Sequence, residues 1–242
     1  MAVRALDDSQ RRAAKYAAVA YLISFVTVVL VNFGIFARLI VRGNSAETAR
    51  NILAHETLFR IGIVGDLVYC MGVVMLLTAL YVILKPVDQN LALLAAFGRL
   101  VYAVVSALVP LNLLTAVRLL SGAEYARVFV PDQLAVLARL YLTGFDQYYV
   151  GLLFWSLAST VCAYLWFKSG YVPRALAAFG LLGSAWCAAS TVALFIFPTF
   201  PTMVNLWWFD SPMALFELAL SFLLLFKGLQ NPATPTPAGP ES

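Results

Sequence analysis

The sequence predicts an all-α, polytopic membrane protein, a bundle of six transmembrane helices joined by short loops. Apolar residues make up 62% of the 242 residues, and the mean hydropathy is +0.87. Charged residues make up only 12%, about half the usual ~25% of soluble proteins. The apolar residues gather in six runs, and a helix of ~20 residues crosses the ~30 Å hydrocarbon core of a bilayer. This composition excludes a soluble globular enzyme.

The six runs define the predicted domain organisation. Met1–Lys15 is polar and forms a cytoplasmic N-terminal segment, and residues 16–228 form the transmembrane domain. The first run is too long for the ~7–15-residue apolar core of a cleaved signal peptide, so we expect it to be retained as a span. Residues 229–242 are rich in proline and predict a disordered cytoplasmic tail. The expected spans are about 16–36, 58–84, 91–114, 147–167, 175–197 and 212–226.

The connecting segments also carry signals. Residues 42–56 predict a loop or a surface helix, and residues 134–142 predict an interfacial helix after a polar loop. Pro110 and Asn112 predict a kink or local break near the end of the third span. Aromatic residues of the fourth span fit belts at the two membrane interfaces, namely Tyr148, Tyr149, Trp155, Tyr164 and Trp166.

Basic residues set the predicted orientation. The formal charge is +4 and the isoelectric point is near 9.0, but the basic residues are scattered, so no nucleic-acid surface is predicted. An even number of spans puts both termini on one side, and all lysines fall on that side. We therefore predict cytoplasmic termini. The basic residues are Arg4, Arg11, Arg12, Lys15, Lys85, Lys168, Arg174 and Lys227 on that side, and Arg38, Arg42, Arg50, Arg118, Arg127 and Arg139 opposite.

Glycines mark one face of the second span. Gly62, Gly65 and Gly72 share a helical stripe with Tyr69. Small residues on such a stripe allow a neighbouring helix to approach closely, so this face is a candidate packing surface.

Two opposite charges are expected at equal depth in the membrane. Arg99 lies roughly 13 Å and Glu217 roughly 15 Å from the cytoplasmic ends of their spans, counting ~1.5 Å per residue. One such group alone costs about 2.5–3.5 kcal/mol at a helix centre, and pairing is the simplest compensation. We therefore predict an Arg99–Glu217 charge pair, with Tyr69 and Tyr102 as supporting hydrogen-bond partners. A structural salt bridge and a functional pathway are both compatible with such a pair.

Other polar groups predict a rim on the far side of the membrane. Asp66 lies about 28 Å from the cytoplasmic end of its span. Arg60 lies farther out, where its side chain can reach the interface. The outer polar candidates are Arg60, Asp66, Asn112, Asp146 and Asn32.

Neither a metal nor a cofactor is predicted. His55 is the single histidine, so a paired-histidine metal or haem site cannot form within one chain, and we expect a solvated loop histidine. Cys70, Cys162 and Cys187 lie in apolar runs without C-x-x-C spacing, as expected of buried packing residues.

Three functional classes remain open. The interior charges favour the binding or transport of a small ligand or a proton through a polar site inside the bundle. A structural subunit could instead pack against other membrane proteins through the glycine stripe. An intramembrane lipid-modifying enzyme could use Asp66 or Glu217 as acid or base, but no nucleophile accompanies them. The bilayer is the one certain partner, and the oligomeric state is not set by the sequence.

Five motifs in order resemble one family. They are Glu56–Gly62 with Asp66-Leu67, then Ala79–Tyr81 leading to Leu84–Val87, then Leu91–Ala96 followed by Arg99, then Gly170–Arg174 with Gly180, and finally Glu217 ahead of Lys227-Gly228. Together they resemble the bacterial family of integral membrane proteins called domain of unknown function 4386 (DUF4386), over about 16–230. The resemblance implies a multi-pass protein of the bacterial plasma membrane without an assigned activity. Tyr102 stands where that family often has an acidic residue, so Arg99 lacks a carboxylate partner three residues on.

Overall fold

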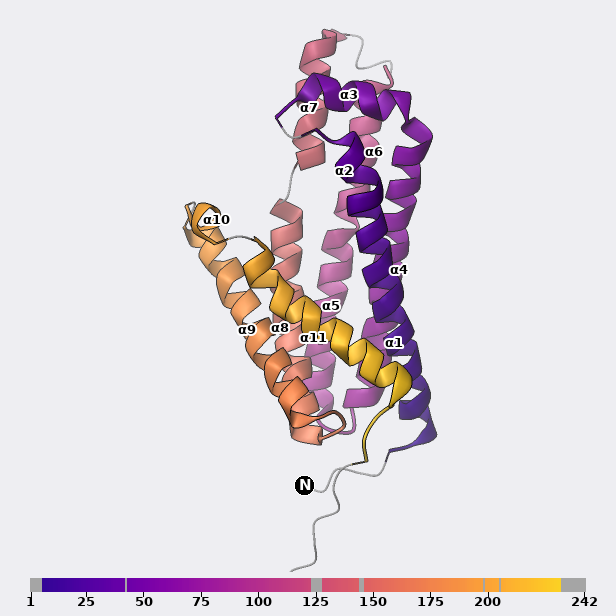
Figure 1. Cartoon of the computed structure of the whole chain (residues 1–242), viewed down its shortest axis with the longest axis vertical. Helices are drawn as coiled ribbons and strands as arrows, with labels where there is room; N and C mark the ends of the chain where they lie inside the picture. Colours follow the sequence, from indigo (N-terminus) through magenta and orange to yellow (C-terminus); the bar gives the residue numbers. More distant parts are fainter. Residues whose placement is uncertain are drawn as a thin grey trace, which may run out of the picture. The chain divides into compact units, whose positions relative to one another are not determined.

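The computed structural model describes residues 6–41, 43–122, 128–143, 146–197, 199–204 and 206–231 (Figure 1). Within these ranges every regular element is a helix, and there is no strand. The helices are α1 (Asp8–Val29), the π-helix η1 (Leu30–Phe36), α2 (Ala37–Leu39), α3 (Ser45–Ala54), α4 (Glu56–Leu84), α5 (Gln89–Ser106), α6 (Leu108–Leu120), α7 (Pro131–Thr143), α8 (Asp146–Ser169), α9 (Arg174–Ile196), α10 (Phe200–Met203) and α11 (Leu206–Phe226).

Six helical stretches are long and apolar enough to cross a membrane, which confirms the predicted fold class. A helix of this length covers the ~30 Å hydrocarbon core. The protein is therefore an all-α, multi-pass membrane protein. The stretches are Asp8–Leu39, Glu56–Leu84, Gln89–Leu120, Tyr148–Ser169, Arg174–Ile196 and Trp208–Phe226.

The first helix begins at Asp8, well before the expected start of the first span at residue 16. The reason is a reciprocal cap. The Asp7 carboxylate accepts from the Gln10 backbone N–H at 2.8 Å, and the Gln10 side chain accepts from the Asp7 N–H at 3.1 Å. Such a capping box satisfies two donors that a helix start otherwise leaves open. The polar segment is thus partly the first turns of α1.

The third membrane stretch is broken, as the sequence predicts. α5 ends at Ser106 and α6 begins at Leu108, with Pro110 in the first turn of α6. Residues 42–56 contain α3, whose N-cap Asn44 accepts from the Glu47 N–H at 3.0 Å. The surface-helix alternative for this segment is therefore the one the chain adopts.

The described chain divides into two compact units, each treated separately below. Unit 1 comprises Met1–Val19, Thr78–Ala96 and Ser156–Ser242, and unit 2 comprises Ala20–Leu77 and Phe97–Trp155. The division falls inside α1, α4, α5 and α8.

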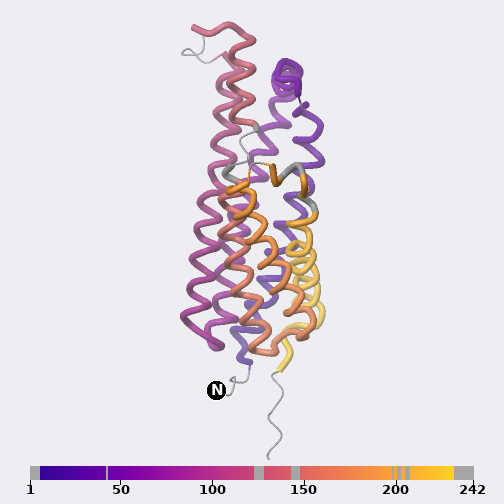
Figure 2. Tube along the Cα trace, turned by 90° about the vertical axis from the view of Figure 1, so that its left-hand side faces the viewer, coloured from indigo at the N-terminus to yellow at the C-terminus, as the bar shows by residue number. Residues whose placement is uncertain are grey.

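In unit 1, α9 packs along α11, as Figures 1 and 2 both show. The contact depends on two glycines of α9. A methyl group at Gly180 would overlap the Phe216 ring, and one at Gly183 would lie 3.1 Å from the Pro212 carbonyl carbon. Small residues therefore set how closely these two helices approach.

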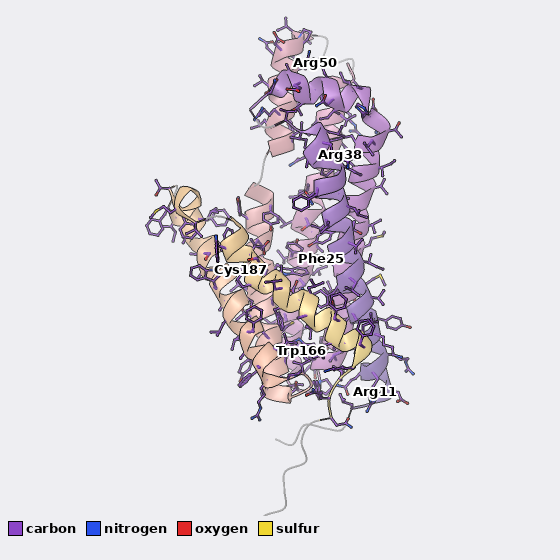
Figure 3. The ribbon with its side chains drawn as sticks, viewed as in Figure 1. Arg11, Phe25, Arg38, Arg50, Trp166 and Cys187 are labelled. Atoms are coloured by element: carbon purple, nitrogen blue, oxygen red, sulfur yellow. The ribbon has the colours of Figure 1, made fainter. Side chains whose placement is uncertain are left out.

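The ends of several unit 1 elements are tied together by hydrogen bonds. The buried Gln10 side chain donates to the Ile83 carbonyl at 3.0 Å and to the Tyr171 hydroxyl at 3.3 Å. The Gln230 N–H donates to the Tyr171 carbonyl at 2.8 Å, and Leu229 is buried. The first residues after α11 thus contact Tyr171. The disordered tail stays a prediction, and its residues 232–242 lie outside the described residues. Arg11, labelled in Figure 3, donates to Asn231 at 3.3 Å.

In unit 2, the glycine stripe of α4 is covered by the chain's own α1 and η1. A Cβ atom at Gly62 would meet the Phe36 ring, one at Gly65 would meet Val31, and one at Gly72 would lie 2.6 Å from the Ser24 hydroxyl. The predicted close helix approach is present, but the partner is internal. This face is therefore not available to another membrane protein, which removes the surface that the structural-subunit alternative used.

The N-terminal end of α4 packs in an apolar cluster of unit 2. Phe59 and Ile63 of α4 share this cluster with Leu113 and Val117 of α6 and with residues of η1 and α3. α7 packs on α6, and α3 lies across both (Figure 1). Arg38 and Arg50, labelled in Figure 3, lie on α2 and α3 of this unit.

Two tryptophans of α8 do not form the predicted interfacial belt. Trp155 is 7% exposed and Trp166 is fully buried, whereas Tyr148 and Tyr164 are exposed as a belt requires. An aromatic belt lies within the first or last turn of a span. Trp155 lies too far inside α8 for that, and its buried ring serves the site described next.

Candidate functional site

The candidate site in unit 2 is built around Arg99 of α5. This side chain is only 1% exposed, although it lies inside a predicted membrane stretch. Its Nη2 donates to the Tyr21 hydroxyl of α1 at 3.3 Å. Its Cζ lies 4.1 Å from the ring centroid of Trp155 in α8 and 5.9 Å from that of Tyr21. The guanidinium is therefore enclosed by aromatic groups from two other helices.

These contacts are large enough to hold a charge inside the bundle. A desolvated cation over a tryptophan face contributes about 2 kcal/mol. A hydrogen bond from a charged donor contributes roughly 1.5–3 kcal/mol, and the 3.3 Å length of the Tyr21 bond favours the lower value. Their sum is comparable to the ~2.5–3.5 kcal/mol that an intramembrane arginine costs. The contacts of Arg99 therefore offset the free-energy cost of placing its charge inside the bundle.

Two tyrosines extend this arrangement, and both were expected to support the site. The Tyr69 and Tyr102 hydroxyls are 2.6 Å apart, and the Tyr102 ring packs on Trp155 with centroids 4.6 Å apart. Gly151 of α8 allows this approach, because a Cβ atom there would lie 3.1 Å from Tyr102 Cδ2. We call Arg99, Tyr21, Tyr69, Tyr102 and Trp155 the arginine cluster.

The second predicted charge, Glu217 of α11, lies in unit 1. Its Oε1 accepts from the Ser159 hydroxyl of α8 at 2.9 Å, and Ser159 is fully buried. This hydrogen bond fixes the position of one carboxylate oxygen of Glu217 against α8. Arg99 and Glu217 belong to different units, so their pairing stays a prediction.

Two of the outer candidates, Arg60 and Asn32, have partners close by in the sequence. Arg60 pairs with Glu56 at 2.7 Å, and both side chains are well exposed, in keeping with an interfacial arginine. Asn32 of η1 is exposed and donates to the Val28 carbonyl in the last turn of α1 at 3.0 Å. Asp146 begins α8, but its side chain lies outside the described part of the structure.

The remaining outer candidates, Asp66 of α4 and Asn112 of α6, are both partly buried. The Asp66 Oδ2 atom is fully enclosed and accepts no hydrogen bond from the residues that the structure describes. His55 lies in the turn before α4, exposed, with Nδ1 3.2 Å from the Asn51 carbonyl. Over the described ranges, no three His, Cys, Asp or Glu side chains gather as metal ligands would.

Sequence reasoning missed Tyr21, Ser159 and Trp155. Trp155 could have been predicted as a buried residue, because it lies well inside its span, where an interfacial belt residue is not expected. Nothing in the sequence indicates the contacts of Tyr21 and Ser159, since the partner of a helix face depends on how the helices pack.

Comparison with known proteins gives one family match and nothing beyond it. Searches among curated proteins and among solved structures find no match. Residues 16–228 match the family described as domain of unknown function (DUF4386), which covers most of the chain. The buried Arg99 and the half-buried Glu217 both fall inside this match. The chain is therefore a member of the DUF4386 family.

Proposed function

We propose that this protein binds or transports a small ligand or a proton through a polar site inside its helix bundle. The observation that carries the proposal is the arginine cluster, in which a fully charged side chain is 1% exposed within a membrane stretch. Intramembrane charges are expensive and most often mark substrate, ion or proton pathways. A planar guanidinium binds carboxylates and phosphates best, so an anionic group is the ligand chemistry that Arg99 favours.

The proposal includes pairing of Arg99 with Glu217. Their equal depths along the sequence support it, because unlike charges in lipid are tolerated best together. Glu217 would then serve as the partner that an incoming anion replaces, or as the group that carries a proton. The Ser159 hydroxyl would hold the carboxylate in either case.

Proton transport can be tested in liposomes that contain the purified full-length protein and a pH-sensitive dye. We expect a membrane potential to drive proton uptake, and Glu217→Gln to lower its rate at least tenfold. The control is Glu56→Gln, which removes an exposed carboxylate at the start of α4. Fluxes equal to those of empty liposomes exclude the proton.

Ligand binding can be tested with the fluorescence of Trp155. Acetate and phosphate are titrated as probe anions, and Trp155→Phe supplies the background from the other tryptophans. We expect saturable quenching that Arg99→Lys removes, because lysine cannot reproduce the planar stacking. Signals that Arg99→Lys leaves unchanged would exclude this site as the binding site.

For the location, we propose a bacterial plasma membrane with both termini in the cytoplasm, as the lysines at one set of span ends suggest. A fluorescent protein fused after Ser242 should fold and emit, whereas an alkaline phosphatase fusion there should be inactive. The opposite pair of results reverses the orientation.

A further inference from the structure

The break between α5 and α6 lies opposite an enclosed carboxylate of α4. One contact in unit 2 relates the levels of these two consecutive helices, because the Tyr69 hydroxyl of α4 lies 2.6 Å from the Tyr102 hydroxyl of α5. The two helices run in opposite directions, and each rises ~1.5 Å per residue. Asp66 lies three residues before Tyr69, so its level on α5 lies about three residues after Tyr102, next to Ser106 and the break.

Asp66 and Ser106 are half-buried, and each lies on a helix stripe whose other residues are buried. On α5, Ser106 follows Arg99, Tyr102 and Ala103 along the buried stripe, at a spacing of three to four residues. On α4, Asp66 lies on the stripe of Phe59 and Ile63, which are buried. Asp66 Oδ2 is itself fully enclosed and accepts no hydrogen bond from the described residues.

The break also changes the backbone chemistry at this level. In an uninterrupted helix, the carbonyl of Ser106 would accept from the N–H of residue 110. Residue 110 is a proline and has no N–H, so this donor is missing. A carbonyl freed in this way is an oxygen ligand, as in transporters whose interrupted helices coordinate Na⁺ with unwound backbone.

We propose that Asp66, together with the carbonyl and hydroxyl of Ser106, forms a binding site for a monovalent metal cation of the size of Na⁺. A hard cation takes oxygen ligands, and one carboxylate balances one positive charge inside the membrane. A divalent cation would need more carboxylates, and the described residues offer no group of three acidic, cysteine or histidine side chains. The site is separate from the arginine cluster and does not depend on the ligand proposed there.

The test is thermal unfolding of the purified full-length protein in detergent micelles. NaCl is compared with KCl and with N-methylglucamine chloride at equal ionic strength. We expect saturating NaCl to raise the midpoint by about 5 °C through binding to the folded state. Asp66→Asn should lose this shift, and Pro110→Ala, which restores the missing N–H, should weaken the apparent Na⁺ affinity several-fold. The matched control Glu56→Gln should keep the shift.

A second measurement applies if Asp66→Asn does not fold. Equilibrium binding of radiolabelled sodium is then compared between the wild type, Ser106→Ala and Pro110→Ala, and both variants should bind more weakly. The proposal is overturned if the wild type shows no saturable, Na⁺-specific shift or binding. It is equally overturned if Asp66→Asn, or both other variants, retain wild-type affinity. Because binding is read without any flux, a negative transport result leaves this outcome unaffected.

Discussion

Replacing Trp155 with alanine is expected to lower the free energy of unfolding by about 3–5 kcal/mol, the usual range for removing a buried aromatic side chain. The loss should fall at the upper end of that range. The same change also removes the face over which Arg99 lies at 4.1 Å and the packing surface of Tyr102. Unfolding of the purified protein by denaturant in micelles measures the difference.

Trp155→Phe is the matched variant, because phenylalanine keeps an aromatic face and most of the buried area. It should cost no more than about 2 kcal/mol, since a phenyl ring still attracts the guanidinium, though less strongly than an indole. If alanine and phenylalanine are equally destabilising, the ring face does not stabilise Arg99. The energetic account of the arginine cluster would then be wrong.

Replacing Gly65 with alanine should destabilise the protein by about 1–3 kcal/mol, although alanine is the better helix former. The added methyl group would overlap Val31 of η1. Val31 is β-branched and buried, so it has little freedom to turn away. The overlap should therefore push η1 away from α4, and thermal unfolding of the variant measures the cost.

Gly34→Ala is the control for this prediction. Gly34 lies in η1, and apart from its two chain neighbours and the backbone of its own helix no atom of the described residues lies within 4 Å of the position that a Cβ would occupy. The change should be neutral or stabilising, because it removes backbone freedom from the unfolded chain. Equal effects at the two glycines would show that the stripe of α4 is not a tight helix contact.

Most of the fold could be predicted, because the bilayer imposes a strong and simple constraint. Six long apolar runs sufficed for six spans, and Pro110 predicted the break after Ser106. The early start of α1 is also predictable from the sequence, because Asp7 and Gln10 have the spacing of a capping box. The polarity of the segment alone points to a later start.

The candidate site was only partly predictable. Arg99 and Glu217 stand out in any apolar run, because charge there is rare. Their neighbours Tyr21 and Ser159 do not, since tyrosine and serine are common in membrane helices and their partners depend on helix rotation. The exposure of Asn32 was not predictable for the same reason, because a periodic pattern does not tell which face of the first span points away from the other helices.

A thermodynamic cycle on Arg99→Gln, Glu217→Gln and the double variant tests most directly whether the two intramembrane charges act as one site. Each single change should leave the other charge without its partner and lower the free energy of unfolding by more than about 2 kcal/mol. The loss in the double variant should be smaller than the sum of the two single losses by at least about 1.5 kcal/mol. Unfolding free energies that add within about 0.5 kcal/mol would show that Arg99 and Glu217 are independent, and would contradict the account.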